Sequence, residues 1–135
     1  MKYLFFLLLL GTIVLKAQNY LLIAHKDVPK LSENQIKAIF LKKMKSKEGV
    51  HFIPVNLGAK DSTRRAFESK YINVSLQRLK SYWAKQHYLG HRPPHSLKSQ
   101  KAVIAFITKV AGSIGYIQES ALKNSDIQII FRWSE

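Results

Sequence analysis

Cysteine is absent from the 135 residues, and this absence excludes several kinds of site. The chain can form no disulfide, no thiolate metal site and no cysteine nucleophile, and it cannot be anchored through a lipidated N-terminal cysteine. Acidic residues are also few, and their scatter provides neither the paired carboxylates nor the ligand spacing that acid–base or metal chemistry needs. We therefore expect no enzymatic activity, no metal site and no cofactor.

The shortage of acidic residues leaves a large positive excess. Lys and Arg number 22 against 8 Asp and Glu, which gives a formal net charge of +14. Such a charge creates a field that attracts phosphate, nucleic acid, anionic lipid or an acidic protein, and it does not choose among them. The length fits one domain preceded by a targeting segment, and the sequence contains no internal repeat and no low-complexity tract.

Residues 1–17 have the layout of a secretory signal peptide. A basic residue, Lys2, precedes a nearly unbroken apolar run, and the small residue Ala17 follows it. The run is shorter than the roughly 20 residues that span a membrane. Leu15 fits a cleavage site poorly, so an uncleaved membrane anchor is the alternative. We expect residues 18–135 to form one domain that is periplasmic or secreted.

Short apolar runs alternate with helical patterns along this domain. Helix starts are predicted at Ser32, which has Gln35 three residues later as in a capping box, and at Asp61, Ser75 and Ser99. The order of elements predicts an α/β fold, a mixed sheet of about four strands flanked by helices. Strand-like runs lie at residues 20–25, 51–56, 114–117 and 127–131.

Two basic segments are open to different interpretations. Lysines crowd residues 42–47, which predicts either a solvated face or a contact with polyanions. His87, His91 and His95 recur every four residues, as metal ligands on a helix would. Helix breakers at Gly90, Pro93 and Pro94 interrupt that spacing, so surface histidines are the favoured interpretation.

Residues 61–65 form the candidate ligand site. A helix N-terminus offers free amides and a positive dipole end, which together attract anions. Ser62 and Thr63 add hydroxyl groups, and Arg64 and Arg65 add guanidinium groups that suit phosphate or carboxylate. The alternative is an ordinary cap by Asp61 or Ser62 followed by two solvated arginines.

Six segments in order resemble a known family. They are residues 31–41 (LSENQIKAIFL), 53–56 (IPVN), 61–67 (DSTRRAF), 82–83 (YW), 90–94 (GHRPP) and 112–117 (GSIGYI). The series is similar to short type 2 periplasmic-binding-protein-like proteins related to the substrate-binding protein of the phosphate ABC transporter. The chain departs from the family pattern at Lys42, where the family has glycine, and at residues 61–63, which lack the glycine of the phosphate binders' Ser-Gly-Thr turn.

The resemblance implies a single lobe of a fold whose larger members close two lobes on a ligand. It implies an exported solute-binding-like protein that binds a small oxyanion such as phosphate at residues 61–65, in connection with an ABC importer's membrane subunit. One lobe offers half a cleft unless a second copy or another envelope protein completes it. The alternative is a basic interaction module of the cell envelope that has kept the fold without small-ligand binding. Nucleic acid is not expected, because export argues against it and no stacking platform is evident.

Overall fold

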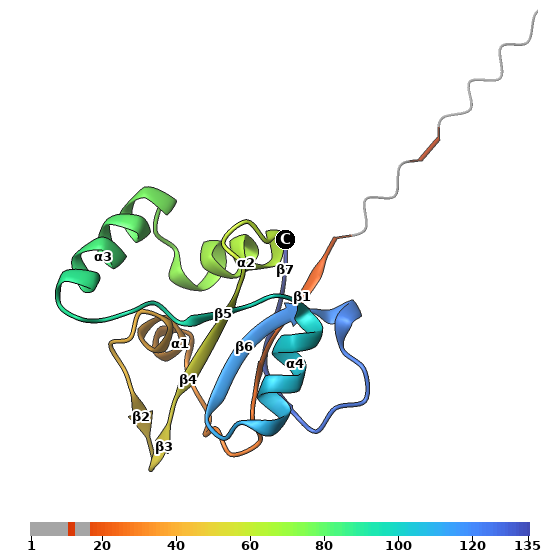
Figure 1. Ribbon diagram of the computed structural model, residues 1–135. Helices are drawn as coiled ribbons and strands as arrows, with labels where there is room; N and C mark the ends of the chain where they lie inside the picture. Colours follow the sequence, from red (N-terminus) through yellow and green to blue (C-terminus); the bar gives the residue numbers. More distant parts are fainter. Residues whose placement is uncertain (1–10, 13–16) are drawn as a thin grey trace, which may run out of the picture.

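A computed structural model describes residues 11–12 and 17–135 of the chain (Figure 1). Most of the predicted signal peptide, residues 1–17, lies outside the described residues. None of the helices within the described ranges is long and apolar enough to cross a membrane.

The domain is built on a five-stranded mixed sheet with strand order β5-β4-β6-β1-β7. β4 runs parallel to both β5 and β6, whereas β1 runs antiparallel to both β6 and β7. The sheet therefore contains the four strands expected from the sequence and adds β5 at one edge. The strands are β1 (Asn19–Ala24), β4 (Ile53–Leu57), β5 (His95–Leu97), β6 (Ser113–Gln118) and β7 (Gln128–Ser134).

The two faces of the sheet are covered by different helices, and neighbouring residues of β6 show how. Gly115 faces α4 (Gln100–Lys109), and a Cβ added to it would lie 2.9 Å from side-chain atoms of both Ile107 and Val103. The glycine thus permits close helix–sheet packing. Tyr116 faces the opposite side, where its ring stacks on Phe67 at 4.2 Å between centroids.

That opposite face is covered by α1 (Glu33–Phe40), α2 (Ser62–Phe67) and the π-helical turn η1 (Glu68–Ile72). The predicted capping box of α1 is present, because Ser32 accepts from the Gln35 amide and Gln35 accepts from the Ser32 amide. Phe40 and Phe67 bring α1 and α2 together, with ring centroids 4.5 Å apart. Apolar burial on both faces makes the core continuous.

The lysine-rich segment after α1 forms a small hairpin of β2 (Ser46–Lys47) and β3 (Val50–His51). Lys42, the first residue beyond the C-cap Leu41 of α1, has a left-handed φ of 62°. Pro54 lies near the start of β4, before the pairing with β5 begins at Val55. It therefore sits at a strand end, as expected for a residue that cannot donate a ladder hydrogen bond.

Helix α3 (Leu76–Tyr88) projects from the sheet at the upper left of Figure 1. The sequence predicts an apolar inner face of Leu76, Leu79, Tyr82 and Trp83, but only Leu79 is buried. Tyr82 and Trp83 are partly buried, and the Leu76 side chain is 52% exposed. The helix is thus held by few contacts, because it extends past the sheet that it would otherwise cover. A short 3-10 turn, η2 (Glu119–Ala121), follows β6.

Candidate functional site

The candidate site begins where the chain turns from β4 into α2. Asp61 is the N-cap of α2, and its Oδ1 accepts a hydrogen bond from the Thr63 amide at 2.8 Å. The Asp61 amide in turn donates to the Gly58 carbonyl at 2.9 Å, which closes the preceding turn. The predicted cap is confirmed, and one amide at this helix start is already bonded within the chain.

Beyond the cap Asp61, the other four predicted residues divide into an inner and an outer set. Thr63 is buried, and its hydroxyl oxygen has no hydrogen-bond partner among the described residues. Arg64 is mostly buried, whereas Ser62 and Arg65 are exposed to solvent. Only Ser62 and Arg65 therefore present their side chains freely to a ligand approaching from outside.

Arg64 is held inside the chain by two contacts. Its Nη1 donates to the Leu57 carbonyl at 3.0 Å, and its Nε lies 3.5 Å from Glu68 Oε1. Both side chains of this pair are only about one-sixth exposed (15% and 16%). Burial raises the pKa of Glu68, and the charges of Arg64 and Arg65 only partly offset that effect. A partly desolvated ion pair thus joins Arg64 of α2 to Glu68 at the start of η1.

A buried polar network next to this pair was not anticipated from the sequence. The Tyr116 hydroxyl donates to Asn56 Oδ1 at 2.9 Å and accepts from the Leu57 amide at 3.1 Å. Burial raises the pKa of Tyr116 above its ordinary value, so the hydroxyl stays protonated. The signals in the sequence are an Asn ending an apolar strand and a Tyr inside one, and neither reveals the other as its partner.

Both arginines line hollows between the α2–η1 segment and α3. Arg64 lines a cavity of about 260 Å³ together with Glu68, Lys80 and Trp83. Arg65 lines a neighbouring cavity of about 240 Å³, on whose wall Glu68 also lies. The hollows therefore combine cationic groups with one carboxylate, and α3 forms their outer wall.

The three histidines do not come together as ligands. His87 lies on α3, His91 follows the helix, and His95 begins β5. His91 Nδ1 lies 2.8 Å from Gln86 Oε1, which accounts for one of its ring nitrogens. Within the described ranges, no group of three His, Asp or Glu side chains could hold a metal ion.

Comparisons with known proteins by sequence find no match. No family model matches the chain, and no curated protein matches it.

Comparison with solved structures gives strong matches to phosphate receptors. The ABC-type phosphate transport receptor from Vibrio cholerae superposes with a TM-score of 0.64 at 13% identity. A phosphate ABC transporter substrate-binding protein from Clostridium perfringens, solved with bound phosphate, gives 0.65 at 18% identity. PstS from Borrelia burgdorferi gives 0.64 at 15% identity. Each match covers 84% of this chain and between 44% and 47% of the other.

The chain thus spans less than half the length of each receptor that it matches. The TM-scores of 0.64 to 0.65 show that this chain shares its fold with part of each receptor. The fold expected from the sequence is confirmed: this chain has the α/β fold of a single lobe of the phosphate-receptor type of periplasmic binding protein.

Proposed function

We propose that the protein is exported and binds a small oxyanion such as phosphate at residues 61–65, in connection with an ABC-type importer. The observation that supports this most directly is that Arg64 and Arg65 each line a hollow between the α2–η1 segment and α3. The fold is shared with receptors for phosphate, one of which was solved with phosphate bound. The net charge of +14 favours any anion that approaches.

The five residues would act in two ways. Ser62 and Arg65 are exposed and would contact the anion through a hydroxyl and a guanidinium group. Asp61 and Arg64 would hold the turn in shape through their bonds to the Thr63 amide and the Leu57 carbonyl. Thr63 lies buried beneath them.

The geometry predicts weak binding. The Asp61 carboxylate occupies one amide and repels an anion, and Glu68 partly neutralises Arg64. A single lobe also encloses a ligand from one side only, whereas tight small-molecule sites bury most of the ligand surface. We expect a dissociation constant of about 1 mM, which corresponds to roughly −4 kcal/mol.

Calorimetric titration of the full chain with phosphate and sulfate tests the proposal. Chloride at equal ionic strength controls for screening. The double variant Ser62→Ala/Arg65→Met should abolish the binding heat, and the matched variant Arg78→Met, on exposed α3, should leave it unchanged. The expected binding heat should be clear at tens of millimolar phosphate, which is roughly ten times the expected dissociation constant or more. If a folded protein shows no binding heat at that concentration, the proposal of oxyanion binding is wrong and only the fold assignment holds.

Export is a separate part of the proposal. Intact-mass analysis of protein purified from the cell envelope should show a chain that begins at Gln18. A mass that retains residues 1–17 would instead favour the uncleaved membrane anchor.

A second candidate function, a basic interaction module that binds a macromolecular partner, is favoured by one observation. The Thr63 amide and the Arg64 guanidinium group, two donors that could otherwise face an anion at the start of α2, are already bonded within the chain. Binding of this kind should weaken steeply with salt and should not change in Ser62→Ala/Arg65→Met. Retention of partner binding in that variant would support the second candidate over the first.

A further inference from the structure

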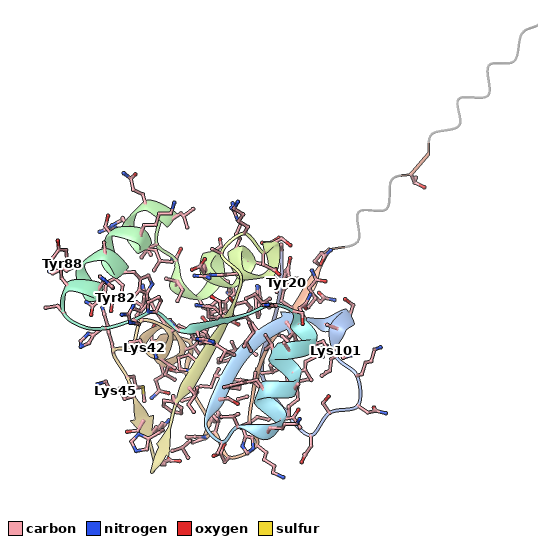
Figure 2. The ribbon with its side chains drawn as sticks, in the orientation of Figure 1. Tyr20, Lys42, Lys45, Tyr82, Tyr88 and Lys101 are labelled. Carbon is pink, nitrogen blue, oxygen red and sulfur yellow. The ribbon has the colours of Figure 1, made fainter. Side chains whose placement is uncertain are left out.

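The outer side of α3 and the loop after it combine exposed cations with exposed apolar groups. We name this the α3 outer surface and define it by its exposed side chains, which are Arg78, Lys85, Tyr88, Leu89 and Arg92. Tyr88 is 93% exposed and Leu89 is 61% exposed, next to each other at the end of the helix. Figure 2 shows Tyr88 at the tip of the projecting helix, far from Lys101 on α4.

The charge of this surface is not balanced by its own chain. No Asp or Glu occurs from residue 69 to residue 118, a stretch that includes all of α3 and α4. Among the described residues, none of the ion pairs involves Arg78, Lys85 or Arg92. Arg78 and Lys85 lie seven residues apart on the helix and therefore share a face. The surface thus presents cations that a partner's acidic groups could pair with.

The apolar groups on this surface have the character of interface anchors. Tyr88 is the one large aromatic side chain that is exposed among the described residues. Tyrosine and arginine are enriched at protein–protein hot spots, where an apolar centre is surrounded by a polar rim. A helix with one buried residue also leaves most of its own surface for a partner to cover.

We propose that the α3 outer surface docks an acidic protein. This inference rests on the second candidate function and names its surface and its partner class. A second copy is disfavoured, because two chains of net charge +14 repel one another. Insertion into a membrane is disfavoured, because the apolar side of α3, with Leu79, Tyr82 and Trp83, is turned toward the domain rather than outward.

The test is an NMR titration of the full chain labelled with ¹⁵N. One probe is a synthetic peptide of repeated Glu-Glu-Leu units, and its control is an all-glutamate peptide of equal length. The first peptide should shift the amides of residues 76–92 and bind at least about tenfold more tightly than the second, because only it can cover Tyr88 and Leu89. Equal binding of the two peptides would overturn the proposal.

Matched variants locate the binding. Lys85→Gln/Arg92→Gln and Tyr88→Ser/Leu89→Ser should each weaken the Glu-Glu-Leu peptide by about tenfold or more. The control Lys101→Gln/Lys109→Gln removes the same charge from the rim of a hollow of about 410 Å³ on α4 and should change affinity less than about twofold. Salt-sensitive binding that maps to α4 would show that the α3 outer surface is not the docking surface, while the second candidate function would still hold.

Two further outcomes decide the partner class. Vesicles of phosphatidylglycerol and phosphatidylcholine should leave the amide signals of residues 76–92 unshifted, even at lipid concentrations at which other basic protein surfaces bind such vesicles. Vesicle binding centred on Tyr88 and Leu89, or self-association broken by Tyr88→Ser/Leu89→Ser, would replace the acidic protein with a membrane or a second copy and so overturn the proposal.

Discussion

The buried hydroxyl of Tyr116 in β6 donates to the side-chain oxygen of Asn56 in β4, 2.9 Å away, and so links two parallel strands by their side chains. The same hydroxyl accepts from the Leu57 amide. Ile53 and Pro54 of β4 pair with Ser113 and Ile114 of β6, where both strands begin. Further along, where β4 leads into the candidate site, the Tyr116 hydroxyl adds a side-chain link between the two strands.

Tyr116→Phe should destabilise the protein by about 1–3 kcal/mol, because it leaves Asn56 Oδ1 and the Leu57 amide buried without their partner. Urea unfolding at neutral pH measures the loss. Tyr88→Phe is the control, since the Tyr88 side chain is 93% exposed, and it should change stability by less than about 0.5 kcal/mol. Equal stability of Tyr116→Phe and the parent chain would mean that this hydroxyl does not hold β4.

Arg64→Met should destabilise the protein by about 1–3 kcal/mol at neutral pH, because Glu68 loses its buried partner. Burial already raises the pKa of Glu68. A carboxyl with a raised pKa contributes stability that is present at low pH and is lost as pH rises through that pKa. Protonation of Glu68 at low pH also removes the negative charge that Arg64 pairs with. The loss of stability caused by Arg64→Met should therefore be smaller at pH 4 than at pH 7.

Arg65→Met is the control for this pH comparison, because the Arg65 side chain is exposed. We expect it to change stability by less than about 0.5 kcal/mol at either pH. A cost of Arg64→Met that is the same at pH 4 and pH 7 would contradict the role given to Glu68.

Lys42→Gly should stabilise the protein by up to about 1 kcal/mol, because Lys42 adopts a φ of 62° that glycine enters without steric cost. Glycine also stands at this position in the sequence pattern that residues 31–41 resemble. Thermal unfolding measures the shift. Lys45→Gly, at a neighbouring lysine without a positive φ, should not stabilise and serves as the control. A destabilised Lys42→Gly would show that the side chain matters more than the backbone strain.

Features set by neighbours in sequence were predictable. The caps at Ser32, Ser75 and Ser99 depend on a donor amide three residues away, and all three are present. The cap at Asp61 follows the same local rule. Local rules failed for β5, because residues 95–97 follow two prolines and become a strand only by pairing with Val55–Leu57.

The candidate site was predictable only in part, for the same reason. The sequence identifies the run of hydroxyl and guanidinium side chains at the start of α2. It does not show that Arg64 is held by the Leu57 carbonyl and Glu68, because both bonds depend on how β4 and η1 pack. The link between Tyr116 and Asn56 spans 60 residues and is set by strand order alone. Pairing across the sheet is the information that the sequence pattern lacks.

Gly112→Ala should destabilise the protein by about 3 kcal/mol or more, because steric overlap and backbone strain act together. An added Cβ would lie 1.9 Å from the His51 carbonyl oxygen, and Gly112 has a φ of 77°. Urea unfolding or loss of soluble protein measures the effect. Gly58→Ala is the matched control, since its Cβ meets nothing within 4 Å, and it should be close to neutral. A Gly112→Ala protein as stable as the parent chain would require the β3 segment to move.

Asp27 ties the end of β1 to the start of β6, and its removal should change the response to acid. Its Oδ1 accepts from the Gly112 amide at 3.0 Å and lies 2.6 Å from His25 Nδ1. Burial acts to raise the pKa of Asp27, but the Gly112 amide and His25 outweigh it, and the pKa falls below its ordinary value of 3.8. A lowered pKa means that this carboxylate stabilises the fold above pH 3.8 and that the contribution is lost as pH falls through the folded-state pKa.

Asp27→Asn should therefore be less stable than the parent chain at pH 7, and the difference should shrink as the pH is lowered below 3.8. Urea unfolding of both proteins at pH 7 and pH 3 measures the two differences. Asp126→Asn removes a carboxylate whose ion pair with Lys26 is largely exposed, so it should show little change at either pH. If the deficit of Asp27→Asn is equally large at pH 3, the Gly112 amide and His25 do not favour the ionised form, and the acid sensitivity of the fold must come from other carboxylates.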